Sequence, residues 1–118
     1  MQRVLICYKN CSTCTKAKKY LSEHEISYRE RDIKADNPTK IELKKWLDRS
    51  TYSIKKFFNT SGKLYRELNL KERLVDMSEE EQLEILSSDG MLVKRPIIID
   101  EDVVLVGFNE REWGKLKK

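Results

Sequence analysis

The chain contains few of the residues from which metal sites and disulfide frameworks are built. Its 118 residues include three cysteines and one histidine. Zinc usually needs four protein ligands, or three and a water molecule. Cys7 lies in an apolar segment and His24 is expected at the far end of a helix, so neither is well placed as a ligand. An odd number of cysteines is also untypical of a small secreted domain held by disulfides. We therefore expect no metal and no cofactor.

Long apolar segments and a strong excess of one charge are also missing. No stretch approaches the roughly 20 apolar residues of a membrane span, and the first residues lack the apolar region of a signal peptide. The 24 Lys and Arg residues are opposed by 20 Asp and Glu, which leaves a net charge of +4. The lysines are spread along the chain, unlike the one-sided basic surface of nucleic-acid-binding domains. We expect a cytoplasmic monomer that binds neither membranes nor nucleic acid directly.

The most informative motif is Cys11-Ser-Thr-Cys14, which lies between an apolar segment and a helix-like stretch. Free amide groups and the dipole at a helix N-terminus stabilise a thiolate. We therefore predict that Cys11 attacks as the thiolate and that Cys14 resolves the resulting mixed disulfide. A C-x-x-C pair beside a β-α-β pattern is typical of a thioredoxin-like redox motif.

Other interpretations of the cysteines give less active roles. A structural disulfide between residues three apart would close almost no loop and remove little chain entropy. Inert buried thiols remain an alternative for Cys11 and Cys14. Cys7 is predicted to be a small core residue, and His24 is predicted to lie on the surface.

Hydrophobic patterning predicts a β-α-β unit in the N-terminal third. Residues 3–8 are nearly continuously apolar, as in a strand that is buried on both faces. Residues 13–23 form a helix with an apolar stripe, and residues 26–33 alternate as a second strand. The crossover between the two strands should be right-handed.

The middle of the chain, residues 38–90, is predicted to be helical. Pro38 is expected in the first turn of a helix, and residues 50–75 are expected to form short helical turns joined by a loop. Ser78 begins a capping box, and Gly90 is expected to cap the end of that helix. The apolar face of the first helix is assigned to Ile41, Leu43, Trp46 and Leu47.

The C-terminal pattern changes back to strands. Residues 96–99 and 103–106 form a predicted hairpin, and Asn109 caps a last helix. The order β-α-β, helices, β-β-α is that of thioredoxin with helices inserted between its halves. We predict a single α/β domain over residues 1–118, with a four-stranded mixed sheet and a helical insertion at about 38–90.

Two stretches of the chain resemble the ArsC/Spx family of thioredoxin-like proteins. They are Cys11–Leu21 (CSTCTKAKKYL) and Leu92–Asp100 (LVKRPIIID), the latter followed by Val106–Glu110 (VGFNE). The family includes arsenate reductases and redox-sensing transcription regulators. The resemblance covers essentially the whole chain, and residues 56–71 are similar to an uncharacterised branch from Gram-positive bacteria.

The resemblance implies roles for Arg95 and Pro96. Pro96 matches the cis-proline that packs beside the cysteine pair, and Arg95 matches an arginine that contacts the oxyanion in arsenate reductases. A guanidinium is always charged and lowers the pKa of a neighbouring thiol. The alternative is that Arg95 is a surface cation and that Pro96 merely begins an edge strand.

The chain also departs from the family pattern. Lys55 and Lys56 stand where further arginines of the reductases are expected, and those reductases have one cysteine in the loop. Asn59 and Thr60, with Lys55, are further candidates for the site, although a plain turn explains 59–62 equally well. Residues 48–52 lack the glycine found in Spx-type regulators.

These features predict a thiol–disulfide oxidoreductase or arsenate-reductase-like protein that uses the Cys11–Cys14 pair. Its expected partner is thioredoxin, glutaredoxin or a low-molecular-weight thiol. The alternative is an Spx-like redox-sensing regulator that binds the C-terminal domain of the RNA polymerase α subunit. The residues leave open whether the protein is an enzyme or a regulator.

Overall fold

The structure, a computed structural model, describes residues 3–118. Its internal contacts divide the chain into two compact units. Residues 3–32 and 95–118 form the first unit, which holds the β-sheet, and Ile33–Lys94 form the second, which is mainly helical. The predicted helical insertion at 38–90 falls inside the second unit. A single domain over residues 1–118 stays a prediction, and its first two residues lie outside the described range.

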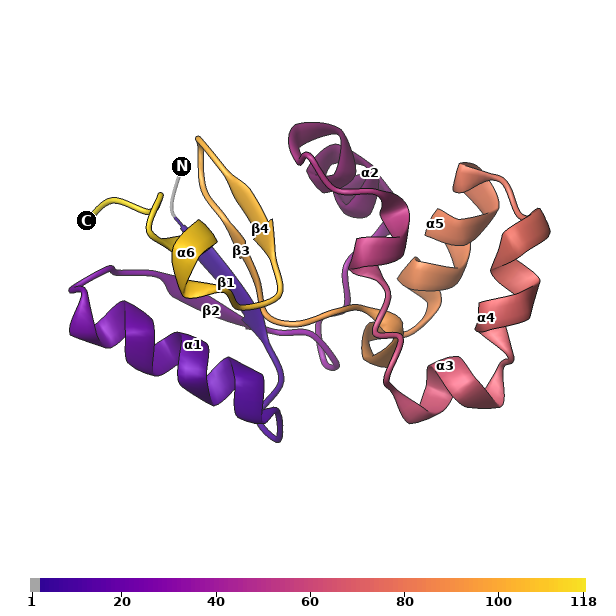
Figure 1. Cartoon of the computed structure of the whole chain (residues 1–118), viewed down its shortest axis with the longest axis horizontal. Coiled ribbons are helices and arrows are strands. Elements are labelled where there is room, and N and C mark those ends of the chain that lie inside the picture. The colour runs from indigo at the N-terminus through magenta and orange to yellow at the C-terminus, as the bar shows by residue number, and fades with distance from the viewer. Residues whose placement is uncertain (1–2) are drawn as a thin grey trace. The chain divides into compact units, whose positions relative to one another are not determined.

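The first unit is a mixed four-stranded sheet with two helices, as predicted (Figure 1). The strands lie in the order β2-β1-β3-β4; β1 pairs with β2 in parallel, and the other pairs are antiparallel. The elements are β1 (Val4–Cys7), α1 (Ser12–Glu23), β2 (Arg29–Asp32), β3 (Ile97–Ile99), β4 (Val104–Val106) and α6 (Glu110–Trp113).

Register and burial explain how this sheet carries its core. Leu5 pairs with Ile98, and Ile98 pairs with Leu105, so the three side chains share one face of the sheet. They belong to a buried cluster with Ala17 of α1 and Trp113 of α6. The two helices therefore cover this face. The core formed here is the support for the segment that carries the cysteines.

The second strand is shorter than predicted. The sequence pattern indicated residues 26–33, whereas β2 spans Arg29–Asp32. β2 pairs with β1 from Val4↔Arg29 to Cys7↔Asp32, so the ladder ends where β1 ends. Ile26 and Ile33 lie outside β2 but are nevertheless buried. These two apolar residues made the alternating pattern in the sequence longer than the strand.

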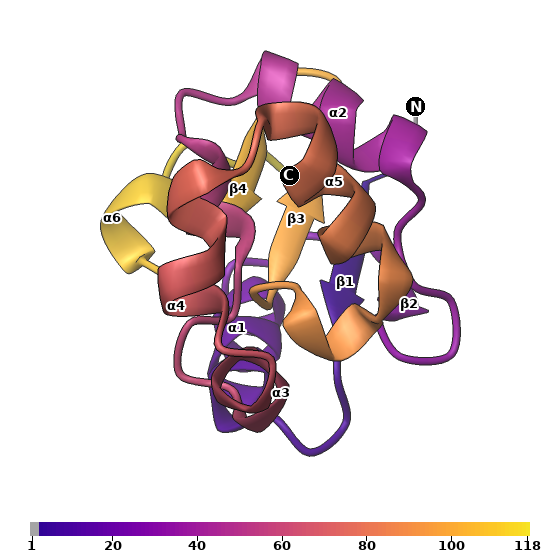
Figure 2. The same cartoon turned by 90° about the vertical axis from the view of Figure 1, so that its right-hand side faces the viewer.

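The second unit consists of short helical elements (Figure 2). The α-helices are α2 (Lys40–Arg49), α3 (Lys63–Glu67), α4 (Leu70–Arg73) and α5 (Glu79–Ser88). The 3-10 turns are η1 (Ile54–Phe57), η2 (Leu74–Asp76) and η3 (Gly90–Leu92). The predicted helical turns in residues 50–75 are confirmed.

The predicted start and apolar face of α2 need correction. Pro38 does not begin the helix; Thr39 is its N-cap, and Lys40 is its first residue. The Thr39 hydroxyl accepts the Glu42 N–H at 3.1 Å, and the Glu42 carboxylate accepts the Thr39 N–H at 3.0 Å. This reciprocal capping box satisfies two free donors and sets the boundary. Ile41 is 71% exposed, so it does not belong to the apolar face.

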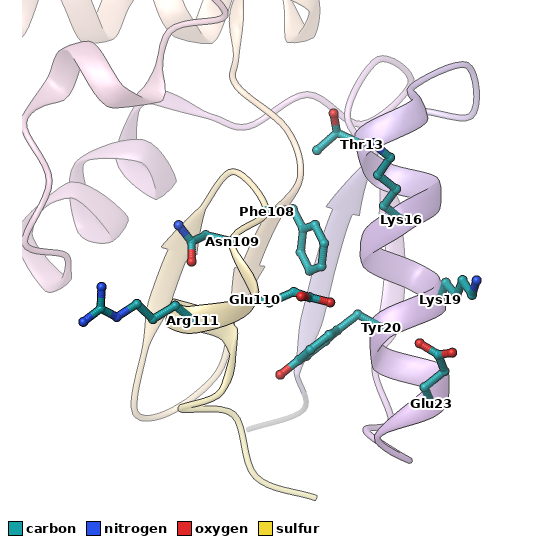
Figure 3. A pocket seen from close by; sticks show the side chains of 9 residues that line it. All are labelled: Thr13, Lys16, Lys19, Tyr20, Glu23, Phe108, Asn109, Glu110 and Arg111. Atoms are coloured by element: carbon teal, nitrogen blue, oxygen red, sulfur yellow. The ribbon is translucent and has the colours of Figure 1, made fainter.

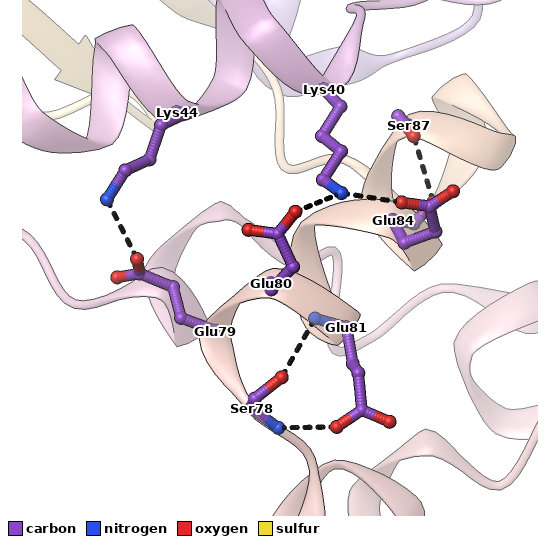
Figure 4. Close-up of polar contacts among 8 residues, drawn as sticks. All are labelled: Lys40, Lys44, Ser78, Glu79, Glu80, Glu81, Glu84 and Ser87. Carbon is purple, nitrogen blue, oxygen red and sulfur yellow. Dashed lines mark hydrogen bonds and ion pairs between the residues drawn. The ribbon is translucent and has the colours of Figure 1, made fainter.

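The predicted capping box at Ser78 is confirmed, with the Ser78 hydroxyl accepting the Glu81 N–H (Figure 4). Figure 4 also shows two lysines of α2 that reach acidic residues of α5. Lys40 Nζ lies 2.8 Å from Glu84 Oε2, and Lys44 Nζ lies 2.9 Å from Glu79 Oε2. Such exposed ion pairs contribute little individually. These ion pairs connect the exposed surfaces of α2 and α5.

Gly90 does not cap α5 as predicted. Asp89 is the C-cap, with extended backbone, and Gly90 begins η3. Gly90 is buried, and a Cβ added there would lie 1.9 Å from the Ile33 carbonyl oxygen. Glycine is therefore required by close backbone packing rather than by a left-handed cap.

Within residues 3–118, helices with the length and apolarity to cross a membrane are absent.

Candidate thiol site

Cys11 and Cys14 lie at the N-terminus of α1, as the motif predicts. Cys11 is the N-cap, with extended backbone at φ −104° and ψ 116°. Its N–H donates to the Tyr8 carbonyl at 3.1 Å, and its own carbonyl accepts the Thr15 N–H at 3.2 Å. The backbone of the loop is therefore tied to the end of β1 on one side and to the first turn of α1 on the other. Cys7, Cys11 and Cys14 are all free thiols.

The three thiols differ in accessibility. Cys7 and Cys14 are each 1% exposed and belong to the core between the sheet and α1. Cys11 is partly buried and packs against that core from outside. Cys11 is therefore the thiol that a dissolved partner can reach, and Cys14 lies behind it.

The surroundings of the Cys14 sulfur favour its charged form. The largest favourable contribution is a hydrogen bond with the Cys7 thiol, followed by the Tyr8 N–H, whose nitrogen lies 3.5 Å from Cys14 Sγ. The Cys11 thiol and the positive charge of Arg95 act in the same direction. Burial opposes them, but together these contacts lower the pKa of Cys14 to about 6.

The position of that charge adds to the sequence interpretation. The motif predicts Cys11 as the attacking thiolate, and this stays a prediction. In the structure the Tyr8 N–H, 3.5 Å from Cys14 Sγ, and the positive charge of Arg95 both favour the charged form of Cys14 and lower its pKa. Cys11 is thus the more accessible thiol, and Cys14 is the thiol whose pKa is lowered.

Pro96 directly precedes β3. The Arg95–Pro96 peptide bond is cis. Pro96 is buried, and its carbonyl accepts the Gly107 N–H at 2.8 Å. β3 pairs with both β1 and β4, so Pro96 begins an inner strand and not an edge strand.

Arg95 is a partly buried cation with unused hydrogen-bond donors. Its guanidinium carbon lies 5.3 Å from the centroid of the Tyr8 ring, within the range of a cation–π contact. Its Nε and Nη1 are buried and, among residues 3–118, have no hydrogen-bond partner. Buried donors normally find a partner, and a guanidinium binds carboxylates and oxyanions strongly. Arg95 is therefore suited to hold an anionic group.

The remaining candidates lie in the helical unit. Lys55 and Thr60 line a groove of about 370 Å³ together with Ser53, Lys56, Phe58 and Lys94. Asn59 is not in this lining. Its N–H donates to the Leu92 carbonyl at 2.8 Å, and its Nδ2 lies 3.5 Å from the Met91 carbonyl oxygen. These contacts hold Asn59 in its turn. Lys55, Asn59 and Thr60 all stay candidates for the site.

A surface pocket of about 710 Å³ extends from the cysteine loop along α1 to the start of α6 (Figure 3). Thr13, which lies between the two cysteines, forms one end of it. Figure 3 shows Phe108 and Tyr20 in the space between the helices, with Lys19 and Arg111 pointing outward. The lining contains both charge signs and two aromatic rings. Its composition does not select one ligand.

Sequence reasoning missed the contribution of Cys7 to the site. It identified Cys7 as a core residue, and burial confirms that, but the contact of its thiol with Cys14 was not foreseen. The available signal was alternation along β1. Cys7 follows Leu5 by two residues, so both point to the face that α1 covers.

Within residues 3–118, clusters of three or more His, Cys, Asp or Glu suited to a metal are absent.

The model of the ArsC family matches residues 7–116, which include the cysteine loop, Arg95 and Pro96. The chain belongs to the ArsC family. An ArsC-family-related protein from Bacteroides fragilis has a similar structure, with a TM-score of 0.97 and 52% identity, covering 99% of this chain and 98% of that one. This likeness agrees with the predicted thioredoxin-like fold.

Two curated relatives of this ArsC-family chain are also informative. The uncharacterized protein YusI of Bacillus subtilis is 55% identical over 90% of each chain. This agrees with the predicted similarity to an uncharacterised Gram-positive branch. The regulatory protein MgsR of B. subtilis is 34% identical over 94% of this chain and 86% of its own. The relatives thus include a named regulator.

Proposed function

We propose that this ArsC-family protein is a cytoplasmic thiol–disulfide oxidoreductase that uses Cys11 and Cys14. The observation that carries the proposal is the pairing of an accessible thiol with a buried one whose sulfur is stabilised as an anion. Cys11 is the group a disulfide can approach. Cys14 lies in the first turn of the helix that Cys11 caps.

The reaction divides into two exchanges. In the first, the Cys11 proton passes to the Cys14 sulfur, and the Cys11 thiolate attacks a disulfide of the partner. A mixed disulfide forms on Cys11, and one partner thiolate leaves. That thiolate takes the proton from Cys14, and the Cys14 thiolate then attacks Cys11 and releases the second partner thiolate. The Cys11 thiol and the Cys14 thiolate are oxidised to one disulfide, and the partner disulfide is reduced to one thiol and one thiolate.

Arg95 is proposed to orient an anionic partner at this site. The unused Nε and Nη1 donors can bind a carboxylate or an oxyanion. Low-molecular-weight thiols that end in carboxylates, and acidic segments of thioredoxin or glutaredoxin, carry such groups. The same donors suit an arsenate oxyanion, but the pair of cysteines favours disulfide exchange because the second thiol is already present within the loop.

Trapping the mixed disulfide tests this proposal. Reduced wild-type protein treated with glutathione disulfide should form a Cys11–Cys14 disulfide. Cys14→Ser should instead retain one glutathione on Cys11, and Cys11→Ser should retain none at neutral pH. Peptide mass spectrometry identifies each product. Glutathione attached to Cys7, or a wild-type protein that keeps all its thiols free, would contradict the assignment.

A second candidate function is redox-sensing regulation. It is favoured by the relationship to MgsR at 34% identity and to a global transcriptional regulator Spx of Enterococcus faecalis at 35%. In this case the Cys11–Cys14 disulfide would alter a surface for the C-terminal domain of the RNA polymerase α subunit. A pull-down with that domain, using reduced and oxidised protein, distinguishes the two functions. Redox-dependent capture without turnover of disulfides would favour the regulator.

A further inference from the structure

Two grooves of the helical unit share part of their lining. One is the groove of about 370 Å³ that is rich in lysine, and the other has a volume of about 260 Å³. Ser53 and Lys55 line both grooves. The buried rings of Phe58 in the first groove and Tyr65 in the second meet edge to face, with their centroids 6.1 Å apart. The two grooves therefore adjoin, and their lining lies entirely within Ile33–Lys94.

The smaller groove has apolar walls and borders an exposed apolar side chain. Ile54, Leu74 and Val75 line it together with Tyr65. Val75 is 79% exposed. The volume of about 260 Å³ lies below the roughly 300–1,000 Å³ that is typical of small-molecule pockets. The groove therefore suits one or two apolar side chains of a longer chain better than a complete small ligand.

The charged side chains that line the two grooves are all cationic. They are Lys55, Lys56, Lys71 and Lys94, and the described residues of both linings include no Asp or Glu. Within residues 3–118, ion pairs involving these four lysines are absent. Lys56 instead lies 5.6 Å from the centroid of the Tyr52 ring. The four charges are therefore available to an anionic partner.

Backbone contacts fix part of this cationic surface between segments that are distant in the sequence. The Lys94 N–H donates to the Phe57 carbonyl at 2.7 Å, and Phe58 pairs with Val93 in an isolated β-bridge. The segment after η3 is thereby held against the end of η1, which carries two of the other lysines. The cationic surface is thus a property of the folded unit.

Another exposed apolar side chain of the same unit has a different charge environment. Ile41 of α2 is 71% exposed and lines a groove with Lys40 and Lys44. Both of these lysines form ion pairs with carboxylates of α5. The cations beside Ile41 are therefore neutralised by the chain itself, whereas those near Val75 are not.

We propose that the two adjoining grooves form a docking surface for an acidic segment of a partner protein. Apolar side chains of that segment enter the smaller groove, and its carboxylates lie along the four lysines. An apolar anchor with a charged surround is a common way to bind a peptide or an amphipathic helix. The complementary charge orients the segment and accelerates its association. This function goes beyond thiol–disulfide exchange and does not depend on it.

The apolar groove favours a protein partner over a nucleic acid. Phosphates could satisfy the lysines, but a nucleic acid has no aliphatic side chain to place beside Ile54, Leu74 and Val75. Proteins that bind single strands stack bases on aromatic rings. Tyr65 is only 6% exposed, so its ring is poorly placed for stacking.

Selection from a random peptide library displayed on phage tests the docking surface. Wild-type protein is the bait, and peptides that also bind Val75→Asp are removed. The enriched peptides should combine acidic residues with leucine, isoleucine or phenylalanine. A selection that enriches no peptide, or only peptides without acidic residues, would overturn the proposal.

Fluorescence anisotropy of an enriched peptide then measures the contribution of each part of the surface. Val75→Asp should weaken binding about tenfold, because it places a negative charge at the apolar contact. Ile41→Asp is its matched control and should leave binding near that of wild type. Lys71→Glu should weaken binding more than Lys45→Glu, which makes the same change in net charge outside the two grooves. These side chains are all exposed, so circular dichroism should show a folded protein in each case.

Two results would contradict the docking surface at this stage. Equal weakening by the variants and their matched controls would mean that net charge alone attracts the peptide. An oligouridylate that displaces the peptide and binds Val75→Asp as tightly as wild type would identify a polyanion site for nucleic acid instead. Failure of the redox function is visible separately, because these binding measurements can use Cys11→Ser, which cannot form the Cys11–Cys14 disulfide.

Discussion

Arg95 is a partly buried cation whose charge acts on the Cys14 sulfur. Its Nε and Nη1 lack hydrogen-bond partners within residues 3–118, and its charge lowers the pKa of Cys14. Keeping such donors unpaired is costly unless a ligand uses them. The residue can therefore act on the site in two ways: through its charge on the resting thiol, and through its donors on an incoming anion.

Replacing Arg95 should separate these effects. Arg95→Ala should raise the Cys14 pKa, because the positive charge of Arg95 favours the charged form of that thiol. It should also slow the reaction with an anionic disulfide, dithiobis(nitrobenzoate), more than with cationic cystamine. Arg95→Lys should retain part of the effect, since the charge remains while the planar fork is lost.

Stopped-flow rates with the two disulfides provide the check, and Cys11→Ser is the control for reaction at other thiols. Equal slowing with the anionic and the cationic disulfide would mean that Arg95 does not hold the anion. An unchanged thiolate titration would mean that its charge does not reach Cys14.

At the scale of elements, the boundaries were decided by individual capping and packing contacts. The capping box at Ser78 was predictable from the sequence, because Ser78 and its partner Glu81 are three residues apart. Thr39 and Glu42 form the same box at α2, but the neighbouring Pro38 competed as a start signal and shifted the predicted boundary. Gly90 was assigned to a helix end from local spacing alone. Glycine is required there because the backbone packs against the Ile33 carbonyl, which is remote in sequence.

Gly90→Ala should destabilise the protein. The added Cβ would lie 1.9 Å from the Ile33 carbonyl oxygen, and backbone cannot rotate away as a flexible side chain can. The cost should be on the order of 1–3 kcal/mol, as for other overpacked sites. Urea denaturation of wild type and variant measures it.

Gly114→Ala is the matched control for that experiment. A Cβ at Gly114 would meet the Arg111 carbonyl oxygen at 3.4 Å, and its backbone is right-handed helical at φ −60°. Stability should stay equal or rise by up to about 1 kcal/mol, because alanine has less backbone freedom to lose on folding. A Gly90→Ala variant as stable as Gly114→Ala would contradict the close packing described for η3.

At the scale of the whole molecule, the chain combines the ArsC fold with candidate site residues that depart from the pattern expected of an arsenate reductase. The first unit supplies two cysteines and Arg95, and the cationic groove of the second unit is lined with lysines. A lysine offers a point charge without the planar fork that matches an oxyanion in two places. Membership of the family therefore does not by itself assign arsenate as the substrate.

We expect arsenate reduction with glutathione and glutaredoxin to be weak or absent. Lys55 and Lys56 stand where further arginines are expected around the anion. Cys14 can also close a disulfide with Cys11 before an external thiol reacts. The assay follows consumption of reduced nicotinamide through glutathione reductase, with Cys11→Ser as the background rate. Robust turnover that depends on Cys11 would move the protein to the reductase branch.

The sequence by itself determined those features that depend on neighbours along the chain. The C-x-x-C spacing placed Cys11 and Cys14 at one helix N-terminus, the apolar periodicity identified β1, α1 and the β3–β4 hairpin, and the order of elements indicated the fold. Local geometry is enough for these, because a helix start, an apolar stripe or a hairpin turn is encoded within a few residues. Family motifs then added Arg95 and Pro96 as candidates.

Only the tertiary structure decided what surrounds each sulfur. The end of β1, the first turn of α1 and the segment before β3 meet only when the sheet has formed, so the Tyr8 N–H and the charge of Arg95 act on Cys14 only in the folded chain. Both favour the charged form of Cys14 and lower its pKa. Electrostatic energy depends on distance and solvent exclusion in space, and separation along the chain specifies neither.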